Sequence, residues 1–335
     1  MAVSIEDVAR LANVSISTVS RVINGRDVVN EKTRERVRSA IKELGYQPNV
    51  FARGLMLRKS HLLGMVLPDL HGEFYSEVIR GANAKAREHG YHLMVSSFVM
   101  GDDGNAVLNK VGVGGLLDGV AVMVTDLHAR STETLSHLAG PIVVMDGQGE
   151  DDSHDTIQID QMQGARAMMD HLLAATNIRR IVFVGGGVTN IDTIQRLAAY
   201  REALARAGRP VVDDDIYHLD YEYTTAFDFG LDHATSWAEA NTCVFAANDE
   251  MAAGIVHAAT AKGLSVPADL RIVGFDDTRI SRLTRPPLTT VRVPMAQMGE
   301  TAVELLCQRL ADPDRPPQHV VLPAEIVVRQ SCGCQ

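Results

Sequence analysis

The sequence predicts a small all-α head followed by an α/β body with parallel sheets. Short amphipathic helical segments fill the stretch from Ser4 to Gly45, whereas apolar runs typical of buried strands alternate with amphipathic stretches from His61 onward. The same alternation starts again after Asp160, which indicates a second α/β unit. A chain of 335 residues with 46% hydrophobic and 22% charged residues is also too long for one small core.

The first helical segment begins with a capping-box pattern, in which Ser4 is followed three residues later by Asp7. Asn13 then stands at the break between two helices, where asparagine tolerates a left-handed backbone. Ser15 and Asn30 are in position to cap a second and a third helix. Three short helices around one small core follow from this pattern.

The second helix has an outward face with no evident packing role. Val19 and Val22 turn inward, whereas the outward positions hold Ile16, Ser17, Ser20 and Arg21. In a helix-turn-helix the second helix enters the DNA major groove, where arginine can bind guanine through two hydrogen bonds and an apolar side chain can meet a thymine methyl group. A generic helical hairpin is the alternative that periodicity alone leaves open.

Charge is divided unevenly along the chain. Residues 1–59 hold 11 basic and 6 acidic residues, a net charge of +5, whereas the remainder holds 21 basic and 36 acidic residues, a net charge of −15. This division is typical of a polyanion-binding head on a body that the polyanion repels, although chance clustering on solvated faces would give the same count.

The opening stretch "IEDVARLANVSISTVSRVIN" and the later "VNEKTRERVRSAIKELGYQPNVFARGL" resemble the head of the lactose-repressor/galactose-repressor (LacI/GalR) family of bacterial transcription regulators. "GMVLPDLHGEFYSEVIRGA", "AANDEMAAGI", "RIVGFDDTRIS" and "RPPLTTVRVPM" continue the resemblance in the family's order. The resemblance implies a helix-turn-helix domain at 1–46 that binds double-stranded operator DNA. Its implied DNA contacts are Ile16, Ser17, Thr18, Ser20, Arg21 and Asn24.

The segment 47–60 is helix-capable but short, with Gly54 in its middle, so it should be marginal alone. The resemblance implies a hinge helix in which Ala52 and Leu55 contact the minor groove and bend the duplex. A plain interdomain linker is the alternative.

The body, at 61–335, shows strand-like runs such as "LLGMVLP", "GVAVMV", "RRIVFVGGG" and "CVFAAND". The resemblance implies a two-lobed periplasmic-binding-protein-like core that binds an effector and mediates dimerisation. We expect the lobes at about 61–160 plus 292–322 and at 161–291 plus 323–330, with "TTVRVP" returning the chain to the first lobe.

Polar side chains cluster where the predicted strands end, as Asp146, Asn248 and Asp276 do. Parallel sheets place ligands beyond these ends, and carboxylate, amide and guanidinium groups suit a polyhydroxylated ligand. A strand-end aspartate can equally be a helix cap or turn former. The resemblance implies a site that includes Phe74, Tyr75, Asp146, Arg196, Tyr221, Asn248 and Asp276.

Enzymatic, membrane and metal-binding classes find no support in the sequence. "GGG" at 185–187 lacks the rest of a P-loop, no serine lies in a G-x-S-x-G elbow, and the 12 histidines and 4 cysteines show no paired ligand spacing. No apolar run approaches the ~20 residues of a spanning helix, so we expect a soluble, cytoplasmic protein without metal or cofactor.

We therefore expect a sequence-specific DNA-binding regulator, specifically a repressor. It would bind a pseudo-palindromic operator as a homodimer and respond to a small polar effector, a sugar or sugar derivative, between the lobes. One alternative is a catabolite-control-type regulator whose corepressor is a phosphorylated carrier protein. Another is a solute-binding protein without a DNA role.

Overall fold

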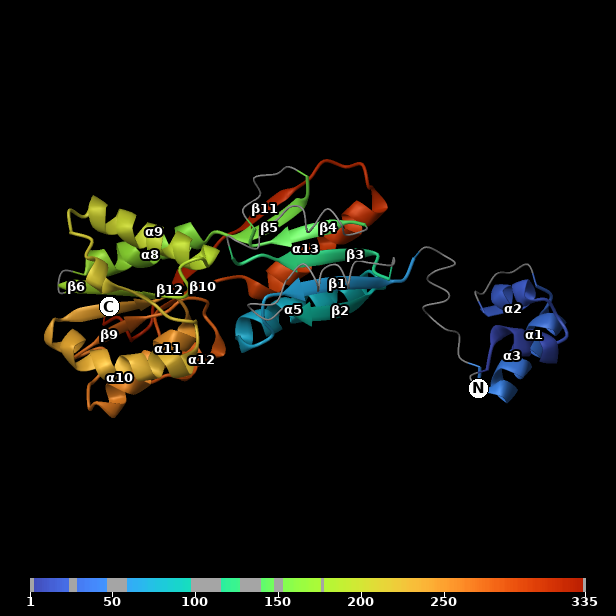
Figure 1. Ribbon diagram of the computed structural model, residues 1–335, viewed down its shortest axis with the longest axis horizontal. Coiled ribbons are helices and arrows are strands. Elements are labelled where there is room, and N and C mark those ends of the chain that lie inside the picture. Colours follow the sequence, from blue (N-terminus) through green and yellow to red (C-terminus); the bar gives the residue numbers. More distant parts are fainter. Residues whose placement is uncertain are drawn as a thin grey trace. The chain divides into compact units, whose positions relative to one another are not determined.

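The computed structural model describes residues 3–23, 29–46, 59–97, 116–126, 140–147, 153–175 and 178–333. The chain forms two compact units, residues 1–60 and residues 61–335, and Figure 1 labels the helices and strands of each. We call residues 1–46 the head and residues 61–335 the body. Within the described ranges, none of the helices combines the length and the apolar character that crossing a membrane would require.

The head consists of α1 (Ile5–Leu11), α2 (Ile16–Ile23) and α3 (Glu31–Leu44). These helices share one apolar core in which Val8, Val19 and Val37 are fully buried, as the helical spacing predicts. Because the core is small, the three helices depend on one another for burial.

The turns of the head form as their sequences predict. The Ser4 and Asp7 capping box is confirmed, with Asp7 N donating to Ser4 Oγ at 3.3 Å and Ser4 N donating to Asp7 Oδ2 at 3.0 Å. Asn13 has a left-handed backbone with φ 49°, and Asn30 caps α3. Gly45 ends α3 with φ 61°, a conformation that glycine adopts without strain.

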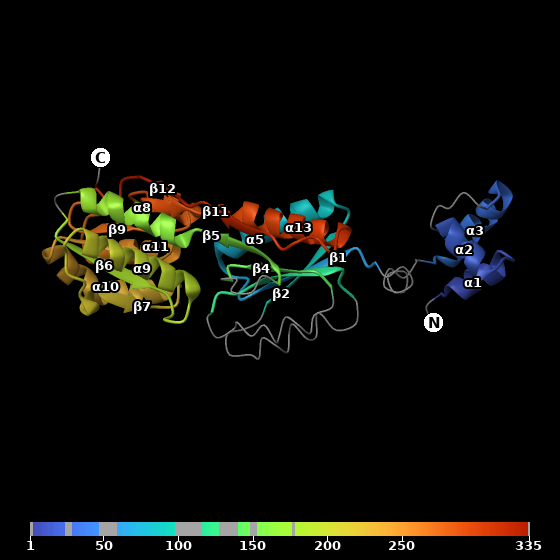
Figure 2. The ribbon, with the colours of Figure 1, turned by 90° about the horizontal axis from the view of Figure 1, so that it is seen from above.

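The first sheet of the body has six strands in the order β11-β5-β4-β3-β1-β2, and every pairing in it is parallel. Its strands are β1 (Leu62–Leu67), β2 (His92–Ser97), β3 (Gly119–Met123), β4 (Ile142–Met145), β5 (Asp155–Ile159) and β11 (His319–Leu322). Figure 2 shows α5 (Gly72–Glu88) and α13 (Met295–Ala311) side by side along this sheet. The segment after "TTVRVP" thus packs against the first sheet through α13.

Two glycines explain how closely α5 and α13 approach. A Cβ atom on Gly81 would lie 1.9 Å from the Ala296 carbonyl oxygen, and one on Gly299 would lie 2.0 Å from the Val78 carbonyl oxygen. No larger residue fits at either position, so the two helices pack backbone against backbone.

The second sheet is also parallel, with the order β7-β6-β8-β9. Its strands are β6 (Arg180–Gly185), β7 (Ile216–His218), β8 (Thr242–Ala246) and β9 (Arg271–Val273). Figure 1 shows one face covered by α8 and α9 and the other by α10 and α11. These helices are α8 (Gln161–Ala174), α9 (Ile191–Arg206), α10 (Tyr223–Glu239) and α11 (Asp249–Ala261).

The chain passes between the two sheets more than once. β5 of the first sheet leads directly into α8 of the second lobe, and β10 (Thr290–Arg292) pairs antiparallel with β12 (Glu325–Val327). β11 then pairs with β5 in the first sheet. The predicted fold class, a helical head plus a two-lobed α/β core with parallel sheets, is confirmed.

Candidate functional site

The first candidate site is the exposed face of α2. Ser15 caps this helix, because Thr18 N donates to Ser15 Oγ at 3.2 Å. The hydroxyl groups of Ser17 and Thr18 each lie 2.8 Å from Ser15 Oγ. The first turn of α2 therefore presents a group of hydroxyls in a defined arrangement.

The two faces of α2 differ sharply in exposure. Val19 and Val22 are buried in the core of the head, whereas the Ile16 side chain is 46% exposed and Ser17 and Arg21 are exposed. Ile16 and Arg21 lie largely outside the core of the head, so this face is accessible to a partner.

Four further residues were predicted to contact DNA, and the structure does not show them on the exposed face of α2. Ser20 is half-buried on α2, while Asn24, Ala52 and Leu55 lie outside the described residues.

The second candidate site is centred on Arg196, whose side chain is 3% exposed. Its Nε and Nη2 atoms donate to Gln161 Oε1 at 3.1 and 2.8 Å, and Nη1 donates to the Ala247 carbonyl oxygen. Its Cζ atom lies 3.9 Å from the centroid of the Phe275 ring. The guanidinium is therefore held on several sides by the protein.

Two carboxylates from the second lobe flank this guanidinium. Arg196 Nη2 lies 3.6 Å from Asp192 Oδ2 and 3.8 Å from Asp276 Oδ1. Burial raises the pKa of both aspartates, and the positive charge of Arg196 opposes this shift. Asp276 also has a left-handed backbone, with φ 110°, and itself forms a parallel bridge with Arg292 at the end of β10.

Asp146 brings a third carboxylate from the first lobe. It follows β4, has φ 56° and is buried. Burial and the negative charge of Asp192 raise its pKa well above the usual value, while the backbone N–H of Ile159 and the charge of Arg196 act in the opposite direction. Asp146 Oδ2 has no hydrogen-bond partner among the described residues.

Tyr221 lies beside these groups and is fixed by a set of hydrogen bonds. Its hydroxyl lies 2.6 Å from Thr193 Oγ1 and donates to Asn190 Oδ1 at 3.0 Å, while its carbonyl accepts from Asn248 Nδ2 at 2.9 Å. A Cβ atom on Gly186 would lie 2.0 Å from the Tyr221 ring. The glycine run at 185–187 therefore makes room for an aromatic ring.

Asn248, which follows β8, makes hydrogen bonds that hold two segments of the second lobe together. Its Oδ1 atom accepts from Met251 N at 2.9 Å and so caps α11, while its amide nitrogen binds the Tyr221 carbonyl. Both ends of this amide are engaged within the protein. The helix-cap alternative for a polar strand-end residue thus describes what Asn248 does in the structure.

Tyr75 approaches from α5 of the first lobe. Burial raises its pKa, and the negative charges of Asp192, Asp69 and Asp146 raise it further. The Phe74 ring packs edge-on against it at a centroid distance of 5.3 Å. We call the group Tyr75, Asp146, Asp192, Arg196, Tyr221 and Asp276 the interlobe site.

Direct contacts join the lobes near this site. Ile191 N, at the start of α9, donates to the Thr125 carbonyl at 2.8 Å, and Thr189 Oγ1 donates to Asp126 Oδ2 at 2.5 Å. Glu73 Oε2 accepts from the backbone of Arg279 at 2.7 Å. Groups of the interlobe site thus sit between segments whose relative positions are set by hydrogen bonds.

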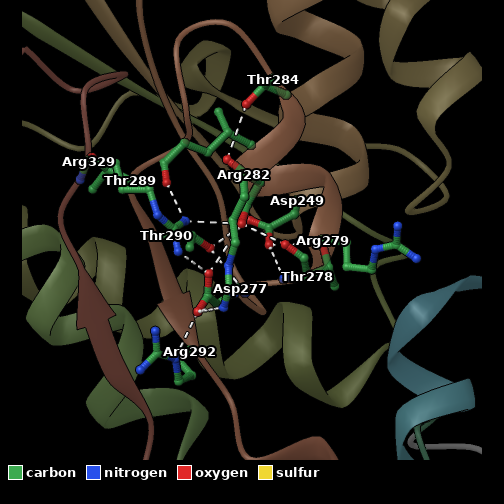
Figure 3. A network of polar contacts seen from close by, with 12 residues as sticks. Asp249, Asp277, Thr278, Arg279, Arg282, Thr284, Thr289, Thr290, Arg292 and Arg329 are labelled. Atoms are coloured by element: carbon green, nitrogen blue, oxygen red, sulfur yellow. Dashed lines mark hydrogen bonds and ion pairs between the residues drawn. The ribbon is translucent and has the colours of Figure 1, made fainter.

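A separate polar network connects the segments that follow β8 and β9 with β10 (Figure 3). Asp249 accepts from the Thr290 hydroxyl at 2.6 Å and from the Thr278 backbone and hydroxyl at 2.8 and 3.1 Å. Burial nevertheless raises the pKa of Asp249 to about 7. Asp277 accepts from three arginines, Arg282, Arg292 and Arg329.

The sequence analysis missed two members of this region. Asp192 precedes Arg196 by one helical turn, so a pairing at positions i and i+4 was the available signal. Gln161 gave no comparable signal, because its contact with Arg196 spans 35 residues. Among the described residues, no group of three or more His, Cys, Asp or Glu side chains is placed to hold a metal ion.

Comparison with known proteins gives independent information. Residues 4–49 match the family "Bacterial regulatory proteins, lacI family", and residues 169–332 match "Periplasmic binding protein-like domain". The chain is 35% identical to Catabolite control protein A of Priestia megaterium over 332 residues, covering 99% of each chain. It is 33% identical to the Ribose operon repressor of Escherichia coli (strain K12), covering 98% of this chain and 99% of the relative.

A solved structure extends this similarity to three dimensions. The lac repressor dimer bound to operator and the anti-inducer ONPF superposes with a TM-score of 0.86 at 27% identity, covering 99% of each chain.

Proposed function

Because the chain belongs to the lacI family of bacterial regulatory proteins, it is a DNA-binding transcriptional regulator, and we propose that it is a repressor. In this proposal a homodimer binds a pseudo-palindromic operator, and a small polar effector in the interlobe site controls it. The domains would be the head at 1–46, a hinge at 47–60 and the effector-binding and dimerisation body at 61–335.

The observation that carries the DNA-binding part is the exposed face of α2. Arg21 would bind guanine through two hydrogen bonds, Ile16 would contact a thymine methyl group, and Ser17 would bond to a base or phosphate. Thr18, Ser20 and Asn24 would complete the contacts of this helix. Two heads would then read two half-sites, which gives the affinity that one small head lacks.

We propose that the hinge also contacts DNA. Leu55 and Ala52 would enter the minor groove when two subunits meet on the operator, and the bent duplex would offer more contact surface. The positive charge of residues 1–59 would neutralise phosphates and make binding sensitive to salt.

The observation that carries the effector part is the buried interlobe cluster. Arg196 and Asp276 from one lobe and Asp146 and Tyr75 from the other converge, so a ligand there would contact both lobes. The solved lac repressor structure holds an anti-inducer, and one relative is named for the ribose operon, which supports a sugar or sugar derivative as effector. Such a ligand would favour one lobe arrangement and change the cost of ordering the hinges on DNA.

The DNA-binding proposal can be tested with fluorescently labelled duplexes from the region upstream of the protein's own gene. Arg21→Ala should weaken binding and relax the choice at one base pair, by about 1–3 kcal/mol. Arg38→Ala, which removes an exposed charge from α3, should leave base choice unchanged. Failure of the full chain to bind any duplex at low salt, with the head folded, would overturn the proposal. Sedimentation of the full chain tests the dimer.

A second candidate for the effector stays open because the chain is 35% identical to Catabolite control protein A. In that case the corepressor would be a phosphorylated carrier protein. Calorimetry against free sugars separates the two, since micromolar binding of a free sugar would argue against a carrier protein as the sole effector.

A further inference from the structure

Among its described residues, the interlobe site places three carboxyl groups around one guanidinium. Asp146, Asp192 and Asp276 all interact electrostatically with Arg196, which is the basic group that the described residues place among them. The three carboxylates are buried or nearly so, and charges in such surroundings are weakly screened. Because burial raises the pKa of all three carboxyl groups, negative charge is already unfavourable in the described part of the site, and a further anion would add to this cost.

The guanidinium of Arg196 is also largely committed to the protein. Three of its N–H groups donate to Gln161 and to the Ala247 carbonyl, and Nη2 faces Asp192 and Asp276. Stacking on Phe275 fixes its plane. An incoming phosphate or carboxylate would have to displace these partners to obtain a bidentate arginine.

Two buried polar atoms at the edge of the cluster lack a hydrogen-bond partner among the described residues. One is an acceptor, Asp146 Oδ2, and the other is a donor, Gln161 Nε2. The two residues are 4% and 2% exposed. Both residues lie near the end of β5. The Ile159 N–H donates a hydrogen bond to the Asp146 carboxyl group, and Gln161 follows Ile159 by two residues. Leaving such groups unsatisfied is costly, so a ligand that supplies both partners gains affinity.

We propose that the effector is a polyhydroxylated molecule without an anionic group, and that Asp146 and Asp192 exclude phosphorylated sugars and other anions. This inference rests on the proposed effector site and narrows its ligand class. The hydroxyl groups of a sugar can donate to Asp146 Oδ2 and accept from Gln161 Nε2, whereas a phosphate dianion can only accept and brings its charge beside the carboxyl groups. The carboxylates therefore select against the charge of a ligand as well as for its hydroxyl groups.

Calorimetry on the full chain tests this directly. Ribose, glucose, galactose, fructose and cellobiose are titrated in parallel with the phosphate monoesters of the monosaccharides. We expect one or more free sugars to bind, and the matching monoester to bind at least about 100-fold more weakly, because like charges placed together are strongly unfavourable. A monoester that binds as tightly as its free sugar would overturn the proposal, and so would the absence of binding in both series.

Asp192→Asn provides the residue-level test, because it removes one negative charge and keeps the size of the side chain. We expect the preference for the free sugar over its monoester to fall at least about tenfold, with a gain in monoester binding. The matched control is Asp214→Asn, which removes the same charge from an exposed position next to β7 and should leave the preference unchanged. An unchanged preference in Asp192→Asn would show that this carboxylate does not select ligands.

The same preparations are tested for duplex DNA binding. If DNA binding persists and the free sugars do not bind, the ligand inference fails while the regulator proposal stands. If DNA binding is absent, the proposed function fails, whatever the sugars do.

Discussion

Replacing Arg196 by alanine should destabilise the body in addition to removing the proposed ligand contact. The substitution leaves Asp192 and Asp276 without their positive neighbour, and it leaves Gln161 Oε1 and the Ala247 carbonyl without a donor. Removing one partner of a buried ion pair costs about 3–5 kcal/mol. Because domains are stable by only about 5–15 kcal/mol, this loss is a large part of the free energy of unfolding.

The loss should depend on pH in a defined direction. Burial already raises the pKa of Asp192 and Asp276 in the folded protein, and Arg196 counteracts the increase. Without Arg196 both pKa values rise further, so the folded state binds protons more readily than the unfolded state. Stability of the variant therefore falls as the pH rises from the ordinary aspartate pKa through the raised one. The deficit should be largest at neutral pH and smaller under mildly acidic conditions.

Urea denaturation followed by tryptophan fluorescence measures this effect. Trp237 is the one tryptophan of the chain, is 1% exposed and lies on α10, so it reports on the body. Arg166→Ala is the matched control, because its exposed ion pair with Glu202 at 2.8 Å should contribute at most about 1 kcal/mol. A loss below about 1 kcal/mol for Arg196→Ala, or one that does not shrink on acidification, would refute the role of Arg196 in balancing the carboxylates.

Substitutions at three further positions test other parts of the structure. Asn13→Val should lower the thermal stability of the head by about 1–2 kcal/mol while Asn13→Gly should not, and equal melting of the two would contradict a left-handed turn. Gly186→Val should displace the Tyr221 ring and abolish effector binding in calorimetry; unchanged sugar affinity would show that the ring is not part of the site. Effector affinity should fall on acidification as Asp146, which faces Asp192, Arg196 and the Ile159 N–H, becomes protonated, and Asp146→Asn should remove this pH dependence.

Local features of the fold could be predicted from the sequence because their causes lie within a few residues. The Ser4 and Asp7 capping box, the left-handed Asn13 and the cap at Asn30 depend on neighbouring groups alone. The longer buried strands, such as Leu62–Leu67 and Arg180–Gly185, were equally predictable, since a continuous apolar run has few other places in a folded protein.

Other elements depend on distant parts of the chain and gave no such signal. β7 and β12 have three residues each, too few for a periodic pattern. β5 begins with the buried Asp155, whose charge is balanced by Arg309 and Arg315 more than 150 residues later. Gln161 was missed for the same reason, because its partner Arg196 is 35 residues away, whereas the i and i+4 spacing of Asp192 and Arg196 was a local signal. The assignment of Arg196 as a ligand residue came from the family resemblance rather than from its own neighbours in the sequence.

The adjacent residues Asp276 and Asp277 differ in their surroundings, and the difference supports the proposed effector role of Asp276. Hydrogen bonds from Arg329, Arg292 and Arg282 outweigh the effect of burial and lower the pKa of Asp277, so this carboxylate stabilises the fold as an ion. Asp276 has the opposite shift, because burial raises its pKa by more than the positive charge of Arg196, 3.8 Å away, lowers it. A ligand hydroxyl that donates to Asp276 or Asp146 would reduce this unfavourable burial. The free energy gained in that contact is available to shift the lobes, whereas a ligand at the fully paired Asp277 would gain nothing comparable.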